Sequence, residues 1–138
     1  MKVATATAGG RRGKAAASGS QPLLQPAVLL SLEQQGGPAL VAKLVGLFCQ
    51  VAPQRVASLQ PAAAALEPAQ ARRAAHGLAP LAAQVGALRL QALAETAEDA
   101  LVAGDTLALA ELHADLAGCC DQVCQALCQQ YPLNRSGG

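Results

Sequence analysis

The sequence predicts an all-α fold, and three observations lead to this prediction. Alanine and leucine dominate a chain of 138 residues, of which 52% are hydrophobic and 14% are charged. These residues favour helices, and the β-branched residues that favour strands are sparse. Apolar residues recur at helical spacing between glycine and proline breakers, so the helices are joined by short connections. Helices joined in this way form an antiparallel bundle, and the length fits one small domain.

The first breakers divide the N-terminal half into short helices. Pro26 suits the first turn of a helix through about residue 35, which Gly36, Gly37 and Pro38 end. A second helix is expected over residues 39–52, because its apolar face is formed at helical spacing by Leu40, Leu44, Leu47 and Phe48. Pro53 marks a break or a new first turn, and a third segment reaches about residue 66.

The C-terminal half contains three longer predicted helices. Pro68 opens a helix to about residue 85, and Gly86 loosens the join to a helix over residues 87–103. Asp105 is a plausible N-cap for a last helix that ends near residue 130. The core stripe of this last helix is expected to comprise Leu109, Leu112, Leu116, Cys119, Val123 and Leu127.

The two ends of the chain differ from its middle. Residues 1–21 are low-complexity and basic, with a charge of +4, and we expect a disordered tail. Residues 132–138 read as a frayed C-terminus, which leaves residues 22–131 as the helical domain. The rest of the chain outside the tail has a charge of −3 and holds two aromatic residues, Phe48 and Tyr131. Nucleic acid is therefore not an expected partner.

The sequence also predicts the compartment. We find no stretch with the length and apolarity of a membrane span, and residues 1–20 lack the apolar region of a secretory signal. Five cysteines are present, and four of them fall within ten residues as Cys119, Cys120, Cys124 and Cys128. Cysteines on consecutive turns of one helix cross-link nothing, so a reducing cytoplasm without membrane contact is predicted.

The most informative segment covers residues 69–85. Its apolar residues gather on one helical face, formed by Ala71, Ala74, Ala75, Leu78, Leu81, Ala82 and Val85. His76 lies opposite this face, so its side chain is expected to point away from the core. Its neighbours on the exposed side are predicted to be Arg72, Arg73, Ala79, Pro80 and Ala83.

An exposed imidazole on such a surface has few chemical uses. We expect no nearby carboxylate to orient His76, and no second histidine stands four residues on to share a metal ion. A nucleophilic nitrogen open to a large partner can accept a phosphoryl group from an aspartyl phosphate. Small neighbouring side chains let that partner approach, and the arginines offset the arriving charge. On this pattern alone, a surface histidine without a role is the commoner interpretation.

The segment resembles the histidine phosphotransfer (HPt) family. The family signature reads H-x-L-K-G, four or five residues, G-A, then leucines at helical spacing, and this chain matches it with His76, Leu78, Gly86, Ala87, Leu90 and Leu93. The flanks are also similar: residues 34–37 and the run from Leu44 to Arg55 look like the first helices, and Ala103, Gly104 and Asp105 precede a long final helix. The resemblance covers about residues 22–130.

The resemblance implies a fold, a function and partners. The fold would be a four-helix bundle with a short N-terminal helical addition, and the protein would be a monomeric phosphorelay intermediate rather than an enzyme. His76 would be the phospho-acceptor, and the surface contacting phosphate or receiver would comprise Arg72, Arg73, Ala79, Pro80 and Ala83. The partners would be response-regulator receiver domains or a hybrid sensor histidine kinase. The chain would need no cofactor of its own, because the receiver supplies Mg²⁺.

Two residues depart from the family pattern. The family lysine after the histidine is Ala79 here, and Arg72 on the same face is a possible substitute. The family glycine is Pro80, which cannot donate a hydrogen bond to the His76 carbonyl. We expect the helix to bend there, or alternatively to end at Leu78 and restart at Pro80. These departures favour an alternative function, a degenerate module that binds receivers or kinases without phosphotransfer.

The remaining candidate residues belong to the last helix. Cys119 and Cys120 are interpreted as small core residues, whereas Cys128 is expected to be exposed. A cysteine-based metal or redox sensor is a less favoured third function, because a closed zinc site needs four ligands. His113 has no signature around it, so we predict a structural or solvent-facing role. Lys43, Arg55 and Arg89 have no placement that indicates a function.

Overall fold

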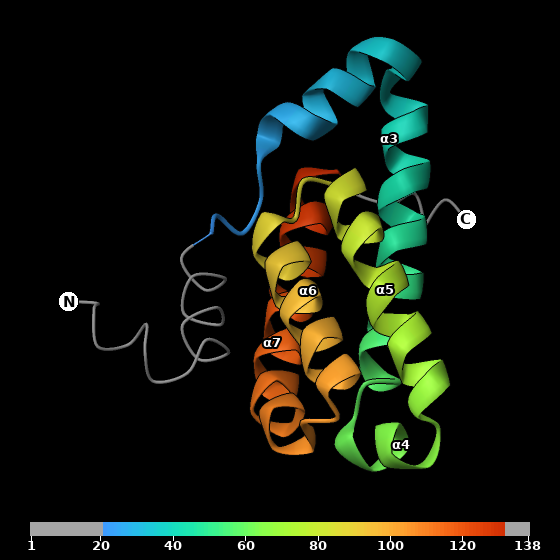
Figure 1. Ribbon diagram of the computed structural model, residues 1–138. Helices are drawn as coiled ribbons and strands as arrows, with labels where there is room; N and C mark the ends of the chain where they lie inside the picture. Colours follow the sequence, from blue (N-terminus) through green and yellow to red (C-terminus); the bar gives the residue numbers. More distant parts are fainter. Residues whose placement is uncertain (1–20, 132–138) are drawn as a thin grey trace, which may run out of the picture.

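The described part of the molecule is helical throughout. The computed structural model describes residues 21–131, and no strand is found within this range (Figure 1). The predicted all-α class is therefore confirmed. The expected disordered tail, apart from Gln21, and the expected frayed end over residues 132–138 lie outside the described residues.

Four long helices run antiparallel to their neighbours in the sequence. In chain order, the long helices and the short helix α4 are α3 (Pro26–Ala57), α4 (Pro61–Leu66), α5 (Pro68–Gln84), α6 (Leu88–Ala103) and α7 (Thr106–Gln130). The second part of α3 forms the bundle with α5, α6 and α7, and short α4 lies at one end of it (Figure 1). Around the bundle, α3 packs on α5, α5 on α6, α6 on α7, and α7 on α3. This is the predicted four-helix bundle.

The first helix changes direction at the predicted breaker. Gly37 has φ 82° and ψ 172°, values outside the helical region that a glycine adopts without steric cost. Before this point α3 forms an arm across one end of the bundle, which is the expected N-terminal helical addition (Figure 1). The break expected at Pro53 is wrong, because α3 continues to Ala57. Pro53 is exposed, while Ala52 and Val56 on either side of it are buried and hold the helix to the bundle.

The buried face of α3 is offset from the predicted one. The fully or almost fully buried residues are Val41, Val45, Phe48, Ala52 and Val56. Leu47, expected in the core, is 49% exposed, and Leu40 and Leu44 are partly buried. Leu40, Leu44 and Leu47 all lie on one side of this stripe, and the packing of α3 against α5 and α7 turns the valine stripe inward instead.

Gly86 joins the arm to the bundle. The backbone N–H of Gln25 donates a hydrogen bond of 2.8 Å to the Gly86 carbonyl. Gly86 has φ 74°, and a Cβ there would lie 2.7 Å from the Gln25 carbonyl oxygen. Both the backbone conformation and the close approach therefore require glycine at the turn between α5 and α6.

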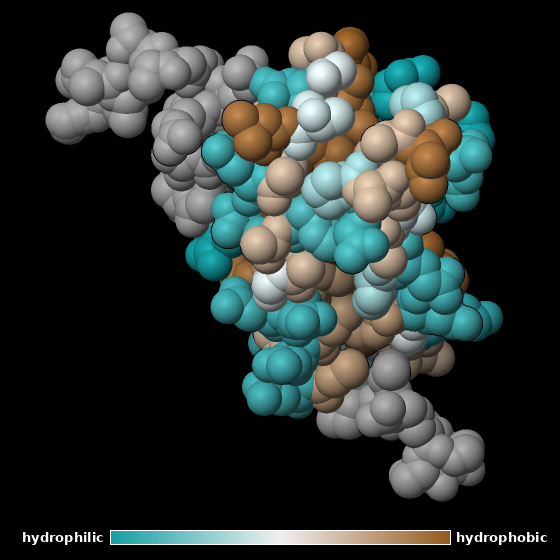
Figure 2. All heavy atoms as spheres, turned by 90° about the horizontal axis from the view of Figure 1, so that it is seen from below, coloured by the Kyte–Doolittle hydropathy of each residue, from teal (hydrophilic) through white to brown (hydrophobic). Residues whose placement is uncertain are grey.

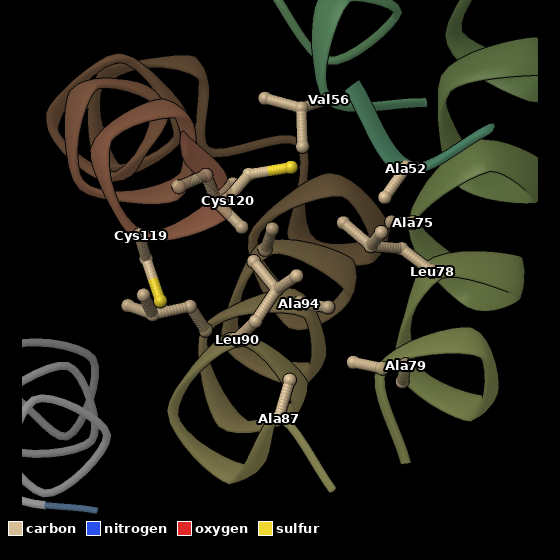
Figure 3. Close-up of a cluster of buried hydrophobic side chains, with 14 of the residues drawn as sticks. Ala52, Val56, Ala75, Leu78, Ala79, Ala87, Leu90, Ala94, Cys119 and Cys120 are labelled. Carbon is tan, nitrogen blue, oxygen red and sulfur yellow. The ribbon is translucent and has the colours of Figure 1, made fainter. Parts of the chain in front are cut away.

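The last helix agrees closely with its prediction. The side chain of Asp105 accepts a hydrogen bond of 3.0 Å from the Ala108 backbone N–H, so it caps α7 as expected. All six residues of the predicted stripe are buried. Across the bundle, alanines and leucines of α5 and α6 face one another and the cysteines of α7 (Figure 3). The small side chains of the alanines let α5 and α6 pack closely.

The prediction that no segment could span a membrane is not supported for α3. By length and composition alone, this helix is apolar enough to cross a membrane. Core helices of bundles meet the same criterion, and α3 is broken at Gly37 and packs on α5 and α7.

At the end that carries α4, apolar and polar residues are interspersed over the surface (Figure 2). Exposed Leu66, Val102 and Leu107 belong to the helix segments at this end.

Candidate functional site

His76 lies in the middle of α5, on a helix that is not interrupted. α5 runs from Pro68 to Gln84 with Pro80 in its interior, so the alternative in which the helix ends at Leu78 is wrong. Pro80 is exposed, whereas Leu78 and Ala82 are fully buried and fix the helix on both sides of it. Packing thus offsets the hydrogen bond that proline cannot make to the His76 carbonyl.

The imidazole has the exposure that the helical pattern predicts. The side chain of His76 is 78% exposed. Arg72, Arg73 and Pro80 are exposed beside it, and Ala83 is partly buried. Ala79 differs from the prediction, because it is 8% exposed and does not lie on this surface. Figure 3 shows Ala79 on the side of α5 that faces α6, near Ala87 and Leu90.

A carboxylate from α6 contacts the histidine, which corrects the expectation that none is near. Glu98 Oε2 lies 2.9 Å from His76 Nδ1. A carboxylate can only accept, so Nδ1 carries the proton and donates it in this hydrogen bond. The neutral ring then has its lone pair on Nε2. The contact joins residues 22 positions apart, and helical periodicity within 69–85 contains no signal for it.

An arginine from α3 approaches the other flank of α5. The Arg55 guanidinium lies where a side chain on Gly77 would be, since a Cβ there would be 2.6 Å from Arg55 Nη1. Arg55 Nε is buried and has no hydrogen-bond partner among residues 21–131. The sequence had given Arg55 no placement near His76, because the contact depends on how α3 packs against α5.

Four of the cysteines, namely Cys49, Cys120, Cys124 and Cys128, lie together where α3 and α7 pack, whereas Cys119 faces α6 (Figure 3). Cys49 Sγ lies 4.0 Å from Cys128 Sγ, so Cys128 is partly buried rather than exposed as expected. Cys119 and Cys120 are buried, as predicted. Burial raises the pKa of Cys119 to about 11, and burial is also the main cause of a raised pKa for Cys49. Raised pKa values keep these thiols protonated at neutral pH.

The other histidine has a structural contact. His113 Nε2 lies 3.2 Å from the Val56 carbonyl oxygen, so it links α7 to the end of α3. This agrees with the structural role that was one of the two predicted for it. Within residues 21–131, no group of three or more histidine, cysteine, aspartate or glutamate residues has the arrangement of a metal site.

Comparison with known proteins identifies one family. Residues 43–130 match the model of the Hpt domain. This range includes His76, its partner Glu98, and Arg55, which lies against Gly77. No curated protein and no solved structure matches the chain.

Proposed function

The chain belongs to the Hpt domain family, and we propose that it relays a phosphoryl group between the aspartates of receiver domains through His76. Histidine phosphotransfer within two-component phosphorelays is the general activity of this family. The observation that carries the assignment to His76 is its geometry. Its imidazole is 78% exposed in the middle of α5, and Glu98 occupies Nδ1.

This geometry favours attack by Nε2. The Nε2 lone pair forms a bond to phosphorus while the bond between phosphorus and the aspartyl oxygen breaks. The receiver aspartate leaves as a carboxylate. Because Nδ1 keeps its proton, the phosphorylated ring carries positive charge. The Glu98 carboxylate stabilises this charge at 2.9 Å from Nδ1. Return of the phosphoryl group to a second aspartate is the reverse reaction.

The surface around His76 suits a protein partner. The exposed side chains of Arg72 and Arg73 provide positive charge one turn before the histidine, where an acidic receiver surface approaches. Pro80 and Ala83 lie one to two turns after His76, and their side chains are small or compact. The partner receiver supplies Mg²⁺ and most of the charge stabilisation, so the chain acts as a phosphorelay intermediate without catalysis of its own. We place it in the cytoplasm as a monomer.

The first test is phosphotransfer from loaded receivers. The full chain is incubated with Mg²⁺ and several receiver domains phosphorylated by acetyl phosphate or by their kinases. We expect an acid-labile, base-stable adduct on the wild-type protein and none on His76→Gln, which keeps size and polarity but lacks the nucleophile. An adduct that persists in His76→Gln would contradict the assignment.

The role of Glu98 is tested in the same assay. Glu98→Gln keeps a hydrogen-bond acceptor but loses the charge, so the transfer rate should fall about tenfold, the size of one charge-assisted hydrogen bond. Glu95→Gln is the matched control, because Glu95 is an exposed residue of the same helix. Equal rates for Glu98→Gln and the wild type would remove Glu98 from the reaction.

A degenerate module that binds receivers without transfer is the second candidate. It is favoured by Ala79, which leaves the position of the family lysine without a charge and buried. Binding of receivers without an adduct on His76 would support this candidate. The Pro80→Gly variant would then show whether the proline prevents transfer.

A further inference from the structure

The contact between Gly77 and Arg55 places a cation against the residue that follows the histidine. A Cβ on Gly77 would lie 2.6 Å from Arg55 Nη1 and 3.1 Å from Arg55 Cζ. The absence of a side chain at residue 77 therefore creates the space in which the guanidinium lies against α5. Gly77 directly follows His76, so this cation from α3 lies against the residue next to the histidine in α5.

Arg55 has hydrogen-bonding capacity that the described residues do not use. Its Nε is buried and has no partner among residues 21–131. A surface cleft of about 400 Å³ lies between α3 and α5. It is lined by Arg55 and Arg73, together with the neutral polar residues Gln54, Ser58 and Gln70. A cleft with two guanidinium groups and three neutral polar side chains is suited to bind an oxyanion.

The charges around His76 indicate which oxyanion belongs there. A phosphoryl group on Nε2 adds nearly two negative charges at neutral pH. Glu98 on the α6 flank repels these charges, and the family lysine that would offset them is replaced by buried Ala79. On the α3 flank, the guanidinium groups of Arg55 and Arg73 can offset part of this charge.

We propose that Arg55 and Arg73 form a binding site for the phosphoryl group carried on His76, and that Gly77 leaves the space this site requires. The inference rests on the proposed phosphorylation of His76. It assigns a role to a side chain of α3, whereas Arg72 on the exposed face of α5 is the substitute cation that the sequence alone indicates. Arg55 stabilises the phosphorylated state and does not act in bond breaking.

The test uses a phosphoryl donor that needs no receiver. Phosphoramidate phosphorylates exposed imidazoles, because the nitrogen displaces ammonia from phosphorus. The full chain is phosphorylated in this way, and the ³¹P chemical shift of the adduct is followed against pH. A nearby cation favours the dianion, so the wild-type titration midpoint should be low. Arg55→Gln and Arg73→Gln should each raise the midpoint by roughly 0.5 to 1 pH unit.

Three further variants separate charge at this site from a general effect. Lys43→Gln removes an exposed cation of α3 about three turns before Arg55 and should leave the midpoint within about 0.2 unit of wild type. Arg55→Lys keeps the charge without the planar fork and should give an intermediate midpoint. Gly77→Ala keeps every charge but displaces the guanidinium, and should raise the midpoint as Arg55→Gln does. A loss of structure alone would not reproduce this order.

The outcomes distinguish this site from the relay itself. If Arg55→Gln titrates like the wild type, or Lys43→Gln shifts as far as Arg55→Gln, the site is wrong even when receivers transfer phosphate to His76. If Arg55→Gln raises the midpoint but no receiver phosphorylates the wild type, the relay is wrong and the site stands. If phosphoramidate leaves His76 unmodified, both are contradicted.

Discussion

Two regions of this bundle concentrate reactive side chains, and their surroundings give them opposite properties. The histidine face comprises His76 with Arg72, Arg73 and Pro80 of α5, and it is flanked by Arg55 and Glu98. The thiol region comprises Cys49 of α3 and the four cysteines of α7. On the histidine face, the imidazole is 78% exposed, Glu98 of α6 contacts it, and Arg55 of α3 lies against the adjacent Gly77. In the thiol region, every cysteine is buried or partly buried.

The comparison shows that density of reactive atoms does not mark a site. The thiol region has five potential nucleophiles, but burial raises the pKa of Cys49 and of Cys119 and keeps their sulfur atoms protonated. A hydrogen bond with Cys124 lowers the pKa of Cys120, but this side chain is buried away from partners. The histidine face has one nucleophile, but a fixed tautomer and nearby charges prepare it for reaction. Exposure and electrostatic surroundings therefore separate the two regions.

The largest expected difference between the regions is in stability. Phe48 is fully buried next to Cys49. Phe48→Ala should lower the free energy of unfolding by about 3–5 kcal/mol, because it leaves a cavity in the core. His76→Gln should change it by less than about 0.5 kcal/mol, because the side chain is exposed. Urea unfolding followed by circular dichroism measures both, and a comparable loss in the two variants would break the comparison.

The next effect concerns the reactivity of the thiols. The pKa of Cys119 is raised from 9.0 to about 11, so its thiolate fraction at pH 8 should be about 100-fold lower than that of an unperturbed thiol. Iodoacetamide labelling followed by peptide mass spectrometry should show this slow reaction in the native protein and a normal rate in urea. The proton is bound more tightly in the folded state. Stability from this group is therefore present below about pH 9 and lost as the pH rises toward 11. Fast labelling at pH 8 would contradict the prediction.

The smallest effect sharpens the description of the histidine face. Pro80→Ala restores a backbone N–H that can donate to the His76 carbonyl, so we expect the free energy of unfolding to rise by about 1–3 kcal/mol. The exposed surface near the histidine changes little, so transfer from receivers should remain within about twofold of wild type. Unfolding and transfer assays on the same preparation measure both quantities. Unchanged stability would mean that the helix already accommodates the proline without cost.

Local patterns were sufficient for much of the fold. The break at Gly37, the cap at Asp105 and the buried stripe of α7 each depend on neighbouring residues in the sequence. The same holds for the outward direction of His76, because most of the buried residues of α5 lie on the opposite side of the helix. Predictions at the edges of apolar faces failed, as for Leu47 and Ala79. At an edge, the position of the neighbouring helix determines which residue is covered.

The sequence by itself determined the helical class, the breakers and the exposed histidine, since these follow from residue type and a period of 3.6. The tertiary structure alone decided what surrounds that histidine. Glu98 reaches Nδ1 from α6, and Arg55 reaches the space beside Gly77 from α3. The same packing brings Cys49 to Cys128 across 79 positions of sequence. Contacts between helices depend on their crossing and register, which no pattern within one helix specifies.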